Sequence, residues 1–89
     1  MTKMLERAIR ELKPTTSRFK VLVYLSFKGP SLPGVIADET MMPRGTVRPA
    51  LRLLLESGFI TQQDDGAYKS KIAFTDIISD LYAFYESER

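Results

Sequence analysis

Residues 32–60 read LPGVIADETMMPRGTVRPALRLLLESGFI, and this stretch decides the fold. Its apolar spacing predicts a short helix over 35–40, a tight turn at 41–42, and a longer helix from 43 or 44 to about 57. Gly58 is expected to end the second helix in a left-handed conformation. The stretch therefore predicts two helices joined by a short turn, followed by a strand.

Two more helices are expected before this stretch. A single apolar stripe predicts a helix over 2–12. Residues 17–27, SRFKVLVYLSF, contain enough β-branched and aromatic residues for a buried strand. We favour a helix, because Thr16 or Ser17 can cap its start and Gly29 can terminate it. This helix, apolar nearly all round, would be central to the core.

Short strands and one last helix complete the predicted chain. Glycines and prolines leave room for a two- or three-residue strand at 31–32. Strands are expected over 59–62 and 67–73, joined at 63–66, where Asp-Gly is a strong hairpin signal. Thr75 is expected to cap a final helix. The fold class is thus mainly α with a small β-hairpin (α+β).

Composition indicates one globular domain and excludes several kinds of chemistry. The chain has 89 residues, 44% hydrophobic and 27% charged, and lacks both Cys and His. Disulfides, cysteine-ligated zinc and His- or Cys-based catalysis are excluded. The sequence shows no GxSxG motif, P-loop or paired carboxylates, so we expect no enzyme, no metal and no cofactor.

The sequence also shows no membrane-spanning segment and no signal peptide. No apolar run approaches the roughly 20 residues that a membrane span needs. The start, MTKMLERAIRELK, lacks the apolar region of a signal peptide. We therefore expect a soluble, cytoplasmic protein with no membrane partner.

Charge is unevenly distributed along the chain. Residues 1–52 carry ten Lys/Arg and four Asp/Glu, or +6, whereas residues 53–89 carry three and seven, or −4, which together give the net +2. Such an arrangement suits a protein with one nucleic-acid face and one other face, although chance also explains it.

The longer helix of the opening stretch divides into a basic and an apolar face. Arg44, Arg48 and Arg52 lie four apart on one row, which can be a solvated face or, in this context, a DNA-contacting one. Thr46 is either a base contact or an N-cap. The apolar positions expected in the core are Val47, Ala50, Leu51, Leu54 and Leu55. Leu53 points elsewhere, to pack under the hairpin or against a partner chain.

Residues from about 18 to 74 resemble the winged helix-turn-helix domains of bacterial and archaeal transcriptional regulators, in the style of the MarR, ArsR and PadR groups. The segments that carry the resemblance are VLVYLSFKG, IADET, MPRGTVRPALRLLLESGFI and the DDG hairpin. In such domains PRGTVRPALRLL corresponds to the recognition helix, and the segment after LLESGFI to the wing. The resemblance implies a DNA-binding regulator, usually dimeric through its terminal helices.

Two positions depart from that pattern. Pro49 either lies inside the recognition helix and disturbs it, or falls in the first turn of a helix that starts at Thr46. Asp64 and Asp65 occupy the wing tip, where carboxylates repel phosphates, so the tip is not expected to enter DNA. The expected DNA-contacting residues are Arg44, Gly45, Thr46, Arg48, Arg52, Lys69, Lys71, Arg18 and Lys20. The basic residues at 18 and 20 are explained equally well as an exposed helix terminus.

The terminal helices supply more apolar surface than so small a core can cover. We regard residues 1–89 as a single domain with its core at about 15–74, and expect the helices at about 2–12 and 75–87 to form a two-fold dimer. An alternative is that the last helix folds back on the first. The expected dimer interface comprises Met4, Leu5, Ile9, Ile78, Leu81, Tyr82 and Tyr85.

The sequence thus leads to one functional hypothesis and one alternative. The first is a sequence-specific, double-stranded-DNA-binding transcriptional regulator, a homodimeric repressor that inserts the helix around 44–57 into the major groove. The alternative is a winged-helix module that binds protein within a larger assembly. The operator, the target genes and any small-molecule effector cannot be read from the residues.

Overall fold

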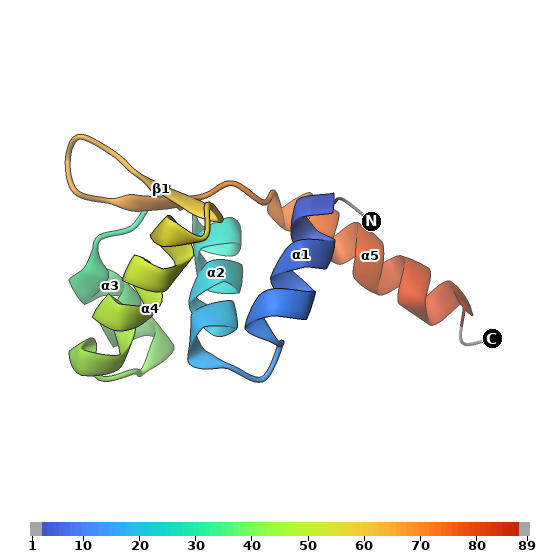
Figure 1. Cartoon of the computed structure of the whole chain (residues 1–89), viewed down its shortest axis with the longest axis horizontal. Helices are drawn as coiled ribbons and strands as arrows, with labels where there is room; N and C mark the ends of the chain where they lie inside the picture. The colour runs from blue at the N-terminus through green and yellow to red at the C-terminus, as the bar shows by residue number, and fades with distance from the viewer. Residues whose placement is uncertain (1–2, 88–89) are drawn as a thin grey trace.

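A computed structural model of the protein describes residues 3–87, except for the side chain of Phe84. Within that range the chain is mainly helical with one small antiparallel sheet, as expected for the α+β class (Figure 1). The elements are α1 (Lys3–Leu12), α2 (Ser17–Lys28), α3 (Pro33–Thr40), α4 (Arg44–Glu56), β1 (Ile60–Gln62), β2 (Tyr68–Ser70) and α5 (Phe74–Ser87).

The ambiguous segment after α1 is a helix, and it is the centre of the core. Thr16 is its N-cap, and the Thr16 hydroxyl accepts a hydrogen bond from the Phe19 N–H at 3.3 Å. Gly29 is its C-cap, and the Gly29 N–H donates to the Leu25 carbonyl at 2.9 Å. Helix α2 packs against α1, α3, α4, β2 and α5, which is why it is apolar on most sides.

Helix α1 belongs to the core of its own chain, which corrects part of the expected dimer interface. Leu5, Ala8 and Leu12 are at most 2% exposed, and Met4 and Ile9 pack partly buried against the same cluster. The expectation that Leu5 contacts a partner is therefore wrong, because its side chain is buried in the core of its own chain, where α1 packs against α2. Residues 1–2, the first of the expected helix 2–12, lie outside the described residues.

Arg7 joins α1 to the end of α4. Its guanidinium donates to the carbonyl of Ser57, lies 4.3 Å from the centre of the Phe59 ring, and pairs with Glu11 at 3.7 Å. A charged donor on a helix C-terminal carbonyl and a cation over an aromatic ring are both favourable. The contact therefore ties α1 to the residues that directly follow α4.

We expect Arg7→Met to lower the free energy of unfolding by about 1–2 kcal/mol, because methionine keeps the apolar stem but loses the donor and the charge. Urea unfolding followed by circular dichroism measures this. Arg10→Met, which makes the same change at an exposed position of α1, is the control. Equal effects of the two substitutions would show that the Ser57 and Phe59 contacts contribute nothing.

The hairpin is present but shorter than predicted. β1 and β2 pair antiparallel, with Ile60 opposite Ser70 and Gln62 opposite Tyr68. The expected strand at 31–32 is a single bridge residue, Ser31, which exchanges backbone hydrogen bonds with Tyr68. Gly66 completes the turn at φ 90°, a conformation that a side chain disfavours.

Burial along α4 differs from the prediction at two leucines. Val47, Ala50, Leu51 and Leu54 are buried, and Leu53 packs partly against the core, although it was expected under the hairpin or against a partner. Leu55 is 40% exposed, so its predicted place in the core is wrong. The helix ends as predicted, with Gly58 at φ 83°.

Helix α5 leaves the body of the molecule. It runs away from α1 and α2 at the right of Figure 1. It begins at Phe74, so Thr75 lies in its first turn and is not its cap, contrary to prediction. Ile77 packs against the core, whereas Ile78, Leu81, Tyr82 and Tyr85 are 46–64% exposed. The apolar stripe therefore does not fold back onto α1. Across residues 3–87, no helix is long and apolar enough to cross a membrane.

Candidate nucleic-acid interface

The turn between α3 and α4 is tightly defined. Met41 takes the left-handed conformation at φ 60°, and the Met42 N–H returns to the Ala37 carbonyl at 3.1 Å. Pro43 then stands as the N-cap of α4 in an extended conformation. With these backbone conformations, α4 begins at Arg44, and only three residues separate it from the end of α3.

Helix α4 starts at Arg44, which decides between the two predictions for Pro49. The Thr46 N–H donates to the Pro43 carbonyl at 2.9 Å, so Thr46 lies inside the first turn and is not an N-cap. Pro49 is consequently inside the helix. Because proline has no N–H, the carbonyl of Gly45 loses its usual donor four residues later. Both residues are exposed.

We expect Pro49→Ala to raise the free energy of unfolding by about 1–2 kcal/mol. Alanine restores the hydrogen bond to Gly45 and favours a helix interior by about 3 kcal/mol, and the greater freedom of the unfolded chain offsets part of this gain. Chemical denaturation of the two proteins tests it. A loss of stability would mean that the proline ring makes a packing contact stronger than the missing hydrogen bond.

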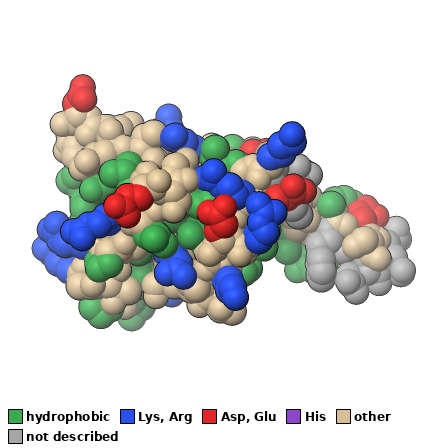
Figure 2. Space-filling view, viewed as in Figure 1, with side chains coloured by type: hydrophobic (Ala, Val, Ile, Leu, Met, Phe, Trp, Pro, Cys, Tyr) green, Lys and Arg blue, Asp and Glu red, His purple; other side chains and the backbone are tan. Residues whose placement is uncertain are grey.

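The arginine row of α4, defined as Arg44, Arg48 and Arg52, faces solvent, opposite the buried face of the helix. The guanidinium of Arg44 lies over α3, where a Cβ placed on Gly34 would approach it to 3.2 Å. Arg48 and Arg52 border a hollow of about 250 Å³ that Pro33, Leu51, Leu55 and Tyr68 also line. Lys and Arg side chains gather on the corresponding edge, over α3 and α4, at the left of Figure 2.

A second hollow borders the other side of α4. It measures about 670 Å³ and lies between the first turn of α2 and the N-terminal half of α4. Its lining comprises Thr15, Thr16, Ser17, Arg18, Gly45, Thr46, Pro49, Ala50 and Leu53. The Nε of Arg18, one of the lining residues, is buried and has no hydrogen-bond partner among residues 3–87. The structure thus brings Arg18, Gly45 and Thr46 together around one hollow. All three were predicted to contact DNA, and such a shared contact requires them to lie close together.

The hydroxyls of Thr15 and Ser17 were missed as candidates in the sequence. They stand beside the exposed start of α2, where backbone N–H groups and the helix dipole favour an anion. In the sequence, a run of Thr and Ser before a helix indicates only helix capping. The sequence does not show that Thr15 and Ser17 lie beside α4, because this depends on how α2 and α4 cross in the folded chain.

Three predicted lysines lie elsewhere. Lys20 borders a hollow with residues of α2, α3 and Phe74, and Lys69 and Lys71 border another with residues of α2 and the start of α5. Neither hollow includes a residue of α4. These lysines are exposed, but the structure does not place them with the arginine row around a common hollow.

The tip of the hairpin is acidic, as the sequence indicates. Asp64 and Asp65 are exposed. Acidic side chains stand at the outer tip of the hairpin, at the upper left of Figure 2. One carboxylate oxygen of Asp65 accepts the Ala67 N–H at 2.9 Å, so this residue has a structural role in the turn. Repulsion between this tip and phosphate remains a prediction.

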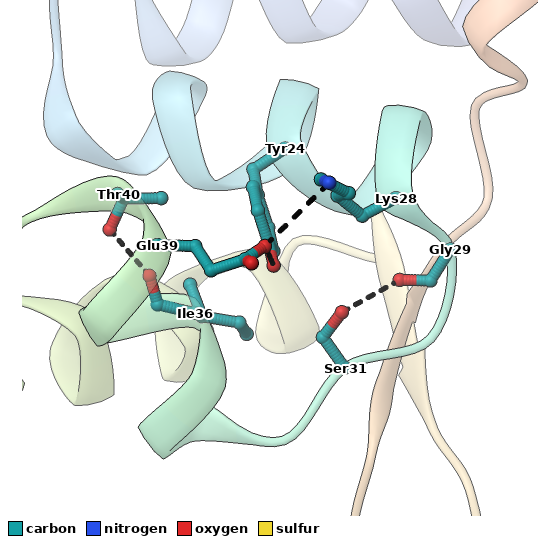
Figure 3. Close-up of polar contacts among 7 residues, drawn as sticks. All are labelled: Tyr24, Lys28, Gly29, Ser31, Ile36, Glu39 and Thr40. Atoms are coloured by element: carbon teal, nitrogen blue, oxygen red, sulfur yellow. Dashed lines mark hydrogen bonds and ion pairs between the residues drawn. The ribbon is translucent and has the colours of Figure 1, made fainter.

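A polar cluster fixes α3 against α2 (Figure 3). The Tyr24 hydroxyl donates to Glu39 at 2.6 Å, and Lys28 lies 3.9 Å from the same carboxylate. Burial, followed by the hydrogen bond to Glu39, raises the pKa of Tyr24, and a hydrogen bond with Ser31 opposes this. The hydroxyls of Thr40 and Ser31 donate to the backbone carbonyls of Ile36 and Gly29.

The raised pKa of Tyr24 predicts a loss of stability in alkali. Because the folded-state pKa lies above the ordinary value of 10.0, this tyrosine contributes stability that is fully present below pH 10 and is lost as the pH rises through the folded-state pKa. The stability advantage of the natural protein over Tyr24→Phe should therefore shrink above about pH 10. Urea unfolding at several pH values tests this, and an advantage that is constant with pH would contradict it.

Within residues 3–87, no group of three or more acidic side chains is placed to hold a metal ion. No family model matches the sequence, and comparisons with curated proteins and with solved structures found no match.

Proposed function

We propose that the protein is a sequence-specific double-stranded-DNA-binding transcriptional regulator with a winged helix-turn-helix fold. In this proposal α4 is the recognition helix and the β1–β2 hairpin is the wing. The observation that supports it best is the arginine row, exposed on the first three turns of α4 directly after the α3–α4 turn. The opposite face of the same helix is buried, so the row is held on a rigid element.

The position of each residue along α4 suggests its role. Arg44, Thr46 and Arg48 lie near the N-terminal end, the part of a recognition helix that reaches base edges in the major groove. Arg52, one turn further on, would hold a phosphate. Arg18, at the edge of the hollow beside α4, is suited to a backbone phosphate on the other side. Gly45 adds no side chain, so the backbone of α4 can approach the DNA closely there.

We propose that the regulator acts in the cytoplasm as a homodimer and represses transcription by occupying a promoter. Two copies related by a two-fold axis would place their recognition helices in successive major grooves, about 34 Å apart. The exposed apolar face of α5 supplies a surface for the second copy.

The second candidate function is a winged-helix module that binds another protein. The exposed side chains of Ile78, Leu81, Tyr82 and Tyr85 favour it, as does the acidic hairpin tip. In that case replacing the arginine row would leave partner binding intact, and polar substitutions on α5 would abolish it.

A salt-titrated binding isotherm on DNA tests the proposal. The protein is titrated against labelled DNA from upstream of its own gene and against a scrambled duplex, at several salt concentrations. We expect affinity to fall steeply with salt and to favour the upstream DNA by about 10³-fold or more. Equal weak binding to both duplexes would reduce the activity to electrostatic adhesion. No binding at low salt would overturn the proposal.

A further inference from the structure

The apolar face of α5 continues into a groove on the body of the same chain. The Phe74 ring packs on Phe27 with 5.1 Å between ring centres, at the point where α5 leaves the domain. Helical spacing puts Ile78, Leu81, Tyr82 and Tyr85 on the same side as Phe74. From Ile78 onward that side is at least 46% exposed.

The groove lies between α2, the end of α3 and the start of α5, and holds about 610 Å³. Its lining is largely apolar and comprises Lys20, Val23, Tyr24, Phe27, Glu39, Thr40, Met41 and Phe74. Phe27 is 61% exposed and Met41 is 90% exposed. A single copy thus carries, on one continuous side, a protruding apolar helix and an apolar hollow at the base of that helix.

We propose that the occupant of this groove is the outer end of α5 from a second copy of the chain. The inference rests on the homodimer of the proposed function and specifies its contacts. A two-fold axis passing near Ile78 pairs the two helices antiparallel, so that the outer end of each α5 meets the base of the other. Tyr82 of one copy then lies opposite Phe74 of the other, and Tyr85 extends about one turn further, along Phe27 and toward Met41.

The exposed apolar surface is of the right size for such a contact. The six side chains that the pairing covers are Phe27, Met41, Ile78, Leu81, Tyr82 and Tyr85. Their exposed parts amount to roughly 600 Å² per copy, compared with about 800 Å² per partner in a standard interface. The polar residues around the groove supply the remainder. Fourteen residues are also too few for a protruding helix to be stable in water without packing.

Charge also favours a second copy over an unrelated apolar partner. Described residues of α5 include the acidic Asp76, Asp80 and Glu86 and no Lys or Arg. The groove presents Lys20, exposed at its edge, while its own carboxylate, Glu39, is already bonded to Tyr24. A carboxylate of one α5 can therefore pair with Lys20 at the edge of the other copy's groove.

The absence of cysteine makes a site-specific cross-linking test possible. Separately purified Met41→Cys and Tyr85→Cys proteins are mixed in equal amounts and oxidised, and intact mass spectrometry separates the mixed disulfide from the two same-site products. We expect the mixed disulfide to exceed the one-half share of a random mixture. Gln63→Cys, on the exposed hairpin loop, replaces Met41→Cys in the control and should give no such excess. Same-site Tyr85 products in excess would indicate parallel helices and overturn the proposal.

A substitution that preserves the fold tests the energetics. Met41 sits at φ 60°, and asparagine tolerates that conformation well, so Met41→Asn removes apolar surface without straining the turn. We expect the dimer dissociation constant, measured by analytical ultracentrifugation, to rise at least about 10-fold. Lys13→Asn is the matched control, because Lys13 is the other described non-glycine residue with positive φ, at 64°, and lies outside the groove. An unchanged constant for Met41→Asn would overturn the groove assignment.

The same sedimentation experiment separates this inference from the proposed function. A species of 10.1 kDa at every concentration would show a monomer and overturn the inference, even if the salt-titrated isotherm still shows specific DNA binding. A dimer with the mixed cross-link but no DNA binding would support the inference and leave the regulator proposal overturned.

Discussion

Arg48→Ala should weaken binding to the specific DNA by about 5- to 150-fold and relax discrimination at the base pair it reads. The expected loss corresponds to one base contact of about 1–3 kcal/mol. Arg48 is suited to this role because it is exposed in the second turn of α4 and is directed away from the buried face. The combined Arg44→Ala/Arg48→Ala protein should retain only non-specific affinity, because both arginines that we propose to reach base edges are then missing.

Arg52→Ala should act differently, because the phosphate contact that we propose for Arg52 does not depend on the base sequence. We expect it to weaken binding to specific and scrambled duplexes alike and to lower the slope of log affinity against log salt by about 1. Fluorescence anisotropy across a salt series measures both quantities. Arg10→Ala removes the same charge from α1 and should change neither. If Arg10→Ala and Arg48→Ala weaken binding equally, net charge alone accounts for the affinity and the arginine row has no special role.

Leu54→Ala should lower the free energy of unfolding by about 2–5 kcal/mol, whereas Leu55→Ala should lower it by less than about 1 kcal/mol. The two leucines are adjacent in α4 and undergo the same chemical change. Leu54 is completely buried, so truncation leaves a cavity that the surrounding core cannot fill. Leu55 is 40% exposed, so water replaces much of what it loses.

Urea denaturation of the two variants, at a protein concentration where the natural chain is a single species, measures the difference. Domains of this size are stable by only about 5–15 kcal/mol, so Leu54→Ala should also lower the melting temperature by many degrees. Similar losses for the two variants would mean that Leu55 is covered, for instance by a bound partner. In that case the hollow bordered by Arg48 and Arg52 would be part of an interface.

The sequence by itself determined the order of the elements and most of their ends. These depend on local chemistry: the Thr16 hydroxyl caps α2, and Gly58 and Gly66 adopt the positive φ angles that end α4 and close the hairpin. The exposed arginine row was also predictable, because a helix fixes which residues share a face. The exceptions are the starts of α3 and α5, which begin at Pro33 and Phe74, and the end of β2 at Ser70.

Tertiary structure decided what each apolar stripe packs against. The stripes of α1 and α5 look alike in sequence, yet Leu5 is 2% exposed and Tyr82 is 64% exposed. Periodicity shows only that a helix has an apolar side, while burial depends on which distant element crosses it. The same reason explains why Leu55 faces outward, and why Arg18 lies beside Thr46 although 28 positions separate them in the chain.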